Sequence, residues 1–302
     1  MQQLLQQLIN GITIGAFYAL VALGYTMVYG VLKLINFAHG GLFMWGAYVG
    51  LTGLNVLLVL LAGGGAVAIF PTAVIVMVTI AMVGVLVERV AYRPLRSAGR
   101  LAPIISALGV AFILESLARN VYGASYKTYP TGLIPVGRVE ILQGVRVSLM
   151  QAIVLIVSFL LMAALYLFVY RTRIGTAMRA VALDHEVSRL MGIDVDRIIA
   201  TVFLIGPGLG GLAGMIVALY YGSFDFTLGW IFGLKAFISA ILGGIGNIPG
   251  AMLGGMILGI IETLGAGYVS PQWKDVIAYV ILILILIFRP TGLLGERVAE
   301  KL

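Results

Sequence analysis

Long apolar segments separated by short polar connections are the feature that most constrains this fold. One segment reads MQAIVLIVSFLLMAALYLFVY over residues 150–170, and another reads IIATVFLIGPGLGGLAGMIVALYY over residues 198–221. A helix needs about 20 apolar residues to cross a bilayer. The chain of 302 residues is 61% hydrophobic and only 10% charged, whereas soluble domains carry about 25% charged residues. The sequence therefore predicts an all-α polytopic membrane protein, with residues 1–302 forming a single transmembrane domain.

Composition also excludes several function classes. The net charge of +7 comes from Lys and Arg in short connections between apolar segments, which indicates membrane topology and no nucleic-acid partner. The chain has no cysteine and two histidines, His39 and His185, and it has no GxxxxGK[ST] phosphate loop. Thiolate chemistry, paired-histidine metal sites and ATP hydrolysis by this chain are therefore not expected. We predict a non-enzymatic protein that holds no cofactor or metal itself.

Eight or nine apolar segments are predicted, and some of them are interrupted by glycine. Residues 231–250 and 251–267 contain glycine pairs and Pro249, so they form either full spans or a re-entrant pair. Arg-rich connections lie on the cytoplasmic side of membranes, which places the N-terminus and the loop 123–149 outside. That loop alternates apolar and polar residues around Gln143 and predicts a small β-hairpin turning at Gln143-Gly144. The nine segments cover residues 8–32, 34–61, 66–92, 103–122, 150–170, 198–221, 231–250, 251–267 and 276–288.

A polar run over residues 171–197 separates two apolar segments and must lie outside the membrane. Its basic content places it on the cytoplasmic side. Apolar residues at helical spacing predict two short helices, which we expect to lie parallel to the membrane with a polar outer face. Asp184 is the predicted N-cap of the second helix, and Gly192 is its predicted C′ residue. The run is interpreted either as a docking surface for another protein or as a solvated loop.

Two stretches of similar pattern, one in each half of the chain, predict a substrate pathway. Each runs from a lysine through apolar residues to a Gly-Gly pair. In transporters, glycine-interrupted segments at corresponding positions of the two halves of the chain point to a substrate site near the middle of the bilayer. Ordinary close packing of helices through small residues is the alternative. The predicted pathway residues are Asn36, His39, Gly40 and Gly41 in the first stretch, and Ser239, Gly243, Gly244 and Asn247 in the second.

Two carboxylates also lie inside apolar segments, Glu115 and Glu262. A charge in the hydrocarbon region is costly and marks a functional candidate. A structural role near the end of a span, with hydrogen bonds to neighbouring helices, is the alternative.

Several motifs together resemble a known family. LKLINFAHGGLFMWGAY near the start, LMGIDVDR after the polar run, GLKAFISAILGGIGNIPGAMLGG and the closing RPTGLLG are similar to permease subunits of branched-chain amino acid ABC importers. The resemblance implies a second homologous permease, two cytoplasmic ATP-binding subunits that bind ATP and Mg²⁺, an extracytoplasmic solute-binding protein and a multi-pass location in a bacterial cytoplasmic (inner) membrane, in contact with lipid. Permeases for urea, short amides or sugars are related alternatives, and a self-sufficient secondary transporter or channel is a further one.

The resemblance also assigns a role to the polar run. ABC permeases carry a coupling motif that reads Glu-Ala-Ala, three further residues and then Gly. Here Glu186-Val187-Ser188 stands in its place, with Gly192 at the expected offset. The residues expected to couple this chain to an ATPase subunit are Asp184, Glu186, Ser188, Arg189 and Gly192.

Overall fold

The computed structural model describes most of the chain. The described residues are 2–61, 65–96, 98–99, 101–130, 132–133, 137–142 and 144–295.

Helices dominate the described chain, and seven of them are long and apolar enough to cross a membrane. Two shorter helices, α9 (Leu228–Gly243) and α11 (Lys274–Phe288), are also apolar. The prediction of an all-α polytopic protein with eight or nine apolar segments is therefore confirmed. The seven long helices are α1 (Gln2–Leu32), α2 (Ala38–Leu60), α3 (Gly65–Val87, continued to Leu95 by the short helices η1, Glu88–Tyr92, and η2, Arg93–Leu95), α4 (Leu101–Tyr122), α5 (Leu149–Arg171), α8 (Val195–Tyr221) and α10 (Ile248–Tyr268).

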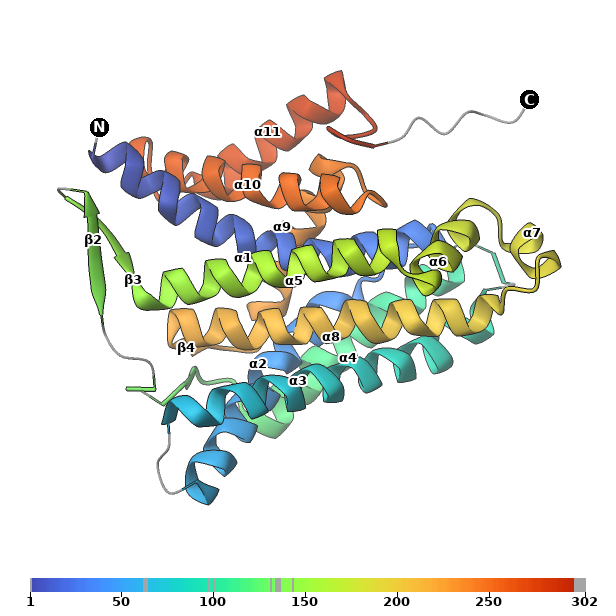
Figure 1. Ribbon diagram of the computed structural model, residues 1–302, viewed down its shortest axis with the longest axis horizontal. Coiled ribbons are helices and arrows are strands. Elements are labelled where there is room, and N and C mark those ends of the chain that lie inside the picture. Colours follow the sequence, from blue (N-terminus) through green and yellow to red (C-terminus); the bar gives the residue numbers. More distant parts are fainter. Residues whose placement is uncertain are drawn as a thin grey trace.

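The connections segregate to the two ends of the bundle (Figure 1). The N-terminus and the strands β2 (Arg138–Leu142) and β3 (Val145–Ser148) lie at one end. The short helices α6 (Arg173–Leu183) and α7 (His185–Leu190) lie at the other. The Arg-rich residues after α3 share the end with α6 and α7, because Arg93 forms an ion pair with Asp196 at the start of α8. The basic connections thus gather opposite the N-terminus, as the predicted topology requires.

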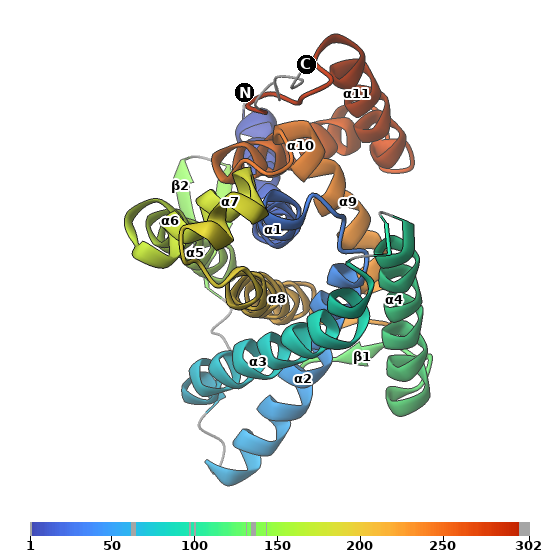
Figure 2. The ribbon, with the colours of Figure 1, turned by 90° about the vertical axis from the view of Figure 1, so that its right-hand side faces the viewer.

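Helix α1 lies at the centre of the bundle when the molecule is viewed along its long axis (Figure 2). It packs closely against α10 through a seam of glycines. A methyl group on Gly15 would lie 2.7 Å from the Met256 Cα atom, and one on Gly11 would lie 2.8 Å from the Ile260 Cα atom. Side chains of any size would separate the two backbones. Small residues permit this approach, which stabilises helix pairs in a membrane through dispersion contacts.

The predicted hairpin is present. Strands β2 and β3 pair antiparallel, and Gly144, in the turn between them, has φ +81°, a conformation that glycine adopts without strain. The chain then enters α5 through a capping box formed by Ser148 and Gln151. A second antiparallel pair joins β1 (Lys127–Thr128) to β4 (Ser223–Phe224) and ties the loop after α4 to the end of α8.

Helices α9 and α10, for which full spans and a re-entrant pair are the two predicted alternatives, form a helical hairpin in which α10 is long enough to cross a membrane and α9 is shorter. The turn between them has two glycines with positive φ, Gly244 at +107° and Gly246 at +97°. It lies at the same end as α6 and α7, since Gly246 approaches Gly30 near the end of α1. Asn247 then caps α10 by accepting a hydrogen bond from the Gly250 N–H at 2.9 Å.

Candidate translocation cavity and coupling surface

Helix α2 begins inside the bundle instead of at its surface. The chain leaves α1 at Leu32, turns at Lys33 with φ +55°, and reaches the first turn of α2 beside the middle of α8, where His39 packs against Gly210. The sequence predicts residues 34–61 as one segment that includes Asn36. Asn36 instead lies before the helix, in the connection.

Asn36 and His39 are both fully buried and held by neighbouring groups. The Tyr92 hydroxyl donates a hydrogen bond to Asn36 Oδ1 at 3.0 Å. His39 Nε2 lies 3.2 Å from the Val21 carbonyl oxygen, and its ring packs edge-on against the Tyr25 ring with centroids 4.8 Å apart. These contacts fix the connection into α2, and neither residue lines the cavity described next.

A cavity of about 80 Å³ lies between α2, α4 and α9, with room for a few water molecules. Gly40 and Gly41, two of the predicted pathway residues, line it. Its walls are otherwise mainly aromatic and aliphatic. The first turn of α2 carries the positive end of a helix dipole and faces this space. The other lining residues are Tyr25, Phe37, Met44, Ala111, Glu115, Phe226, Gly229, Trp230, Gly233, Leu234 and Phe237.

The glycines keep the helices around the cavity close together. A methyl group on Gly229 would lie 2.5 Å from the Gly40 carbonyl oxygen, so the backbones of α2 and α9 touch there. Gly41 differs, because a methyl group on it would meet only the Leu114 side chain of α4, at 3.0 Å. Gly40 therefore sets the packing of α2 against α9, while Gly41 faces a side chain that can adjust.

The predicted pathway residues of the second half lie at other places. Ser239 donates a hydrogen bond back to the Lys235 carbonyl oxygen at 2.8 Å. Gly243 packs against Gly250 inside the α9–α10 hairpin, and Gly244 packs against Gly295. Asn247 caps α10. None of these four residues is among those that line the cavity, so the structure does not bring the two predicted stretches together at one site.

The two intramembrane carboxylates have different environments. Glu115 lines the cavity and is partly buried. Glu262 is buried and accepts hydrogen bonds from Lys235 Nζ and the Tyr18 hydroxyl, each at 2.6 Å. Lys235 also lies 2.7 Å from Asp275 Oδ1 at the start of α11. The cation that pairs with Glu262 thus comes from the neighbouring helix α9 and not from its own segment.

The polar run folds as predicted in its backbone. Asp184 caps α7, accepting hydrogen bonds from the Glu186 and Val187 N–H groups at 2.9 and 3.1 Å. Gly192 follows the helix with φ +83°. Helix α6 buries Met178 and Val181, two residues of the predicted apolar face.

The outer face of this region differs from the prediction. It was expected to be polar, and Glu186 and Arg189 are exposed on it. Large apolar side chains share this surface, because Leu183 and Leu190 are each 86% exposed and Met191 is 78% exposed. The reason is that a helix of six residues packs only one side inward. Ser188 takes that inward position and is 3% exposed, so it is not on the outer surface with Glu186 and Arg189.

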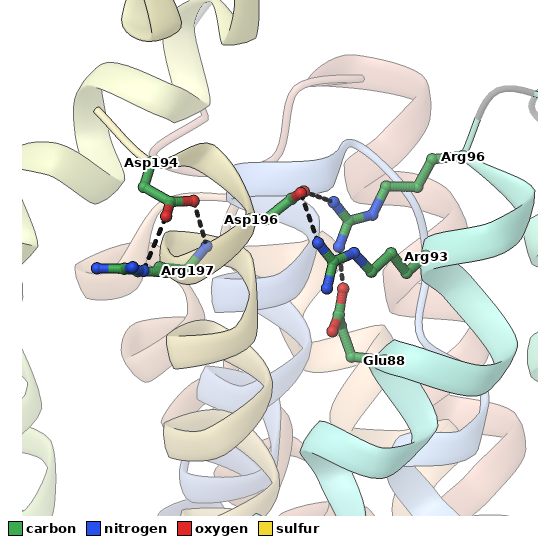
Figure 3. A network of polar contacts seen from close by, with 6 residues as sticks. All are labelled: Glu88, Arg93, Arg96, Asp194, Asp196 and Arg197. Atoms are coloured by element: carbon green, nitrogen blue, oxygen red, sulfur yellow. Dashed lines mark hydrogen bonds and ion pairs between the residues drawn. The ribbon is translucent and has the colours of Figure 1, made fainter. Parts of the chain in front are cut away.

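An ion-pair network joins the segment after α7 to the end of α3 (Figure 3). Asp196 lies 2.8 Å from an Arg93 nitrogen and 2.7 Å from an Arg96 nitrogen. Arg96 also pairs with Glu88, whose side chain is 1% exposed. The network was not predicted, because the four residues come from two separate connections.

Comparison with known proteins identifies the family. The model of the family described as "Branched-chain amino acid transport system / permease component" matches residues 7–286. The chain belongs to this permease family. It is 44% identical to the high-affinity branched-chain amino acid transport system permease protein BraD of Pseudomonas aeruginosa, over 98% of this chain and 97% of BraD. No solved structure matches the chain significantly.

Two further relatives extend this picture of the permease family. LivH of Escherichia coli, a high-affinity branched-chain amino acid transport system permease protein, is 42% identical over 98% of this chain and 97% of LivH. A probable branched-chain amino acid transport permease protein LivM, from Methanocaldococcus jannaschii, is 29% identical over 48% of this chain and 46% of LivM. The resemblance stated from the motifs is thereby confirmed, and the chain is a multi-pass membrane permease component.

Proposed function

We propose that this chain is one of two permease subunits of an importer that carries leucine, isoleucine or valine inward, powered by ATP hydrolysis on separate subunits. The observation that carries the proposal is the exposed apolar face of α7. Exposed apolar side chains outside the membrane mark an interaction site. Leu183 at the end of α6, Leu190 at the end of α7 and Met191 just after it are such side chains, beside a capped helix. A solvated loop has no need of these side chains.

The position of α7 fits a coupling role. It lies at the end of the bundle that collects the basic connections, which the charge rule places in the cytoplasm, where ATP is available. Its C-terminal end leads through Asp194 directly into α8. Asp196 then connects α8 to the end of α3 through Arg93 and Arg96. A movement of α7 caused by an ATP-binding subunit therefore has a short path into two membrane-spanning helices.

The remaining partners follow from the relatives. The likeness to both LivH and LivM supports a second, homologous permease beside this one. Two ATP-binding subunits, an extracytoplasmic solute-binding protein and a bacterial inner membrane complete the proposed assembly. ATP and Mg²⁺ would bind to the partner subunits.

A self-sufficient transporter driven by an ion gradient is less well supported. Such a protein needs a series of ionisable groups across the membrane. In the described chain, Glu262 is engaged by Lys235 and Tyr18, and Glu115 is the one carboxylate on α4. This arrangement provides no continuous relay.

Reconstitution tests the proposal. The chain would be purified with its second permease and ATP-binding subunits, placed in vesicles, and supplied with the solute-binding protein and ATP. We expect uptake of radiolabelled leucine that requires both ATP and the binding protein. Uptake without ATP-binding subunits, or ATP-driven uptake of urea or a sugar in place of leucine, would contradict it.

A further inference from the structure

Glu115, a carboxylate in the wall of the cavity, has no partner among the described residues. Glu115 lies seven residues before the end of α4, about 10 Å inside the helix end at 1.5 Å per residue. It is partly buried and lines the cavity between α2, α4 and α9. Within the described chain, its carboxylate has neither an ion pair nor a hydrogen bond. A charge at this depth requires compensation by another group.

The nearest candidate cation on the same helix does not provide that compensation. Arg119 lies one turn beyond Glu115, at the i, i+4 spacing that favours ion pairs on a helix. Its side chain is exposed, and the two form no ion pair within 4.0 Å. Glu115 is also the only charged residue among the described residues that line the cavity. The carboxylate is therefore available to a cation that enters the cavity.

The rest of the lining suits a ligand with an aliphatic portion. Phe37, Phe226, Trp230 and Phe237 contribute aromatic surface, and Tyr25 adds a further ring. Apolar walls with few polar groups are typical of small-molecule sites. Aromatic faces additionally attract cations. A ligand that carries a cationic group next to an aliphatic side chain matches both properties.

The carboxylate and the aromatic lining of the cavity favour branched-chain amino acids over the alternative substrates. A branched-chain amino acid carries an α-ammonium group beside an aliphatic side chain, so it offers a cation to Glu115 and apolar surface to the aromatic walls. Urea, short amides and neutral sugars offer no cation. A carboxylate could accept hydrogen bonds from the N–H or O–H groups of such molecules, but it would form no ion pair with them.

We propose that Glu115 pairs with the α-ammonium group of the amino acid as it passes through the cavity, while the aromatic walls contact its aliphatic side chain. This proposal rests on the function proposed above. The cavity is smaller than an amino acid in this conformation, so it widens during the transport cycle. Glu115 is then a specificity-determining residue for substrates with a cationic amino group.

The test uses the complete importer in vesicles. Glu115→Gln retains the size of the side chain and removes its charge. A hydrogen bond to a charged group is worth enough to change a rate by about ten- to a hundredfold, so we expect leucine uptake to fall by about that factor. ATP hydrolysis stimulated by the loaded binding protein should continue, because the coupling surface is unchanged. Glu115→Asp, which keeps the charge, should restore part of the uptake.

Two control variants on α4 isolate the role of the carboxylate. Ser116→Gln changes an exposed neighbour outside the cavity, and Arg119→Gln removes the nearby positive charge. Both are expected to transport leucine at the parent rate. An equal loss of uptake in Arg119→Gln and Glu115→Gln would overturn the proposal, because it would show that the two residues act as a pair.

Other outcomes are equally decisive. Normal leucine uptake by Glu115→Gln would overturn the proposal while leaving the importer function intact. Loss of the second permease from the Glu115→Gln complex would also overturn it, by showing that the carboxylate pairs with a cation across the subunit interface. A parent complex that fails to transport leucine would instead contradict the proposed function itself.

Discussion

Lys235 Nζ lies 2.6 Å from Glu262 Oε1 in the interior of the bundle, where the two side chains are only 8% and 5% exposed. The pair joins α9 to α10. Tyr18 from α1 and Asp275 from α11 complete the cluster, and Lys274 lies 3.6 Å from Glu262. Two lysines thus balance two carboxylates. Helix α11 buries only Ala278, so this cluster is its main polar attachment to the bundle.

Removing one member of the buried Lys235–Glu262 pair should lower the free energy of unfolding more than removing both members. Lys235→Met removes the nearest cation from Glu262, and breaking a buried pair in this way costs about 3–5 kcal/mol. Lys274, at 3.6 Å from Glu262, should offset part of that cost. The double variant Lys235→Met/Glu262→Met should recover much of that loss. The free energy of unfolding in detergent would be measured for each. Arg197→Ala is the control, because its pair with Asp194 is exposed and should contribute less than about 1 kcal/mol. A double variant as unstable as the single one would contradict this account.

Substitution of the two adjacent glycines of α2, Gly40 and Gly41, should distinguish a role in helix packing from a role in substrate transport. Gly40→Leu forces α2 away from α9, so we expect loss of thermal stability and of folded yield. Gly41→Leu meets the Leu114 side chain and fills the cavity, so we expect a folded complex with leucine uptake reduced about tenfold or more. Thermal unfolding and uptake would be measured side by side.

Gly244→Leu is a useful comparison for these variants. Gly244 has φ +107° and packs against Gly295, so leucine there should destabilise the α9–α10 hairpin without touching the cavity. Full stability in Gly40→Leu, or normal uptake in Gly41→Leu, would refute the roles assigned to them.

The coupling surface can be tested at Gly192, Glu186 and Leu190. Nothing lies within 4 Å of the position that a Gly192 Cβ atom would occupy, so a side chain there projects outward, toward a docked partner. Gly192→Trp should weaken binding of the ATP-binding subunit, while Gly192→Asn should be tolerated because asparagine adopts positive φ readily. Glu186→Lys and Leu190→Ser should weaken binding more mildly. Copurification and stimulated ATP hydrolysis would be measured. Parent-like behaviour of all the variants would identify the run 171–197 as a solvated loop.

Membrane sidedness can be measured with single cysteines, because the chain has none of its own. Ser125→Cys, in the loop after α4, should react with an impermeant thiol reagent from outside. Arg189→Cys, on the exposed side of α7, should react only from the cytoplasm. Two other serines on the cytoplasmic side are less suitable positions for a labelled cysteine. Ser188 is buried, and Ser97 lies outside the described residues. Labelling of Arg189→Cys from outside in intact cells would reverse the topology.

Local signals predicted much of this structure. Runs of apolar residues located the membrane segments, the alternating pattern near Gln143 predicted the hairpin, and Asp184 and Gly192 marked the ends of α7. Each of these depends on residues close together in the sequence, where propensity and capping act directly. The burial of Ser188 and the exposure of apolar side chains around α7 depend instead on which side of α7 packs against the bundle.

The candidate site was only partly predictable for the same reason. Gly40 and Gly41 line the cavity together with the nearby Phe37, but Glu115 reaches it from α4, and the other aromatic residues come from α1 and from residues 226–237. The pairing of Lys235 with Glu262 joins residues 27 positions apart. Such contacts are set by helix packing, which a pattern within one segment does not contain. The structure also shows that the Gly-Gly pair of the second half belongs to a turn and not to the cavity.

The glycine seam between α1 and α10 has a mechanical consequence. Gly15 lies directly against the Met256 backbone, and Gly11 lies against the Ile260 backbone and the Thr263 side chain, so the two backbones approach closely at these positions. A shift of one helix along the other would drive backbone into backbone. Helices α1 and α10 are therefore expected to move together. The backbone contacts of α9 with α10 and with α2 are equally close, so we expect the cavity to open through displacement of α4, which meets Gly41 only through the Leu114 side chain.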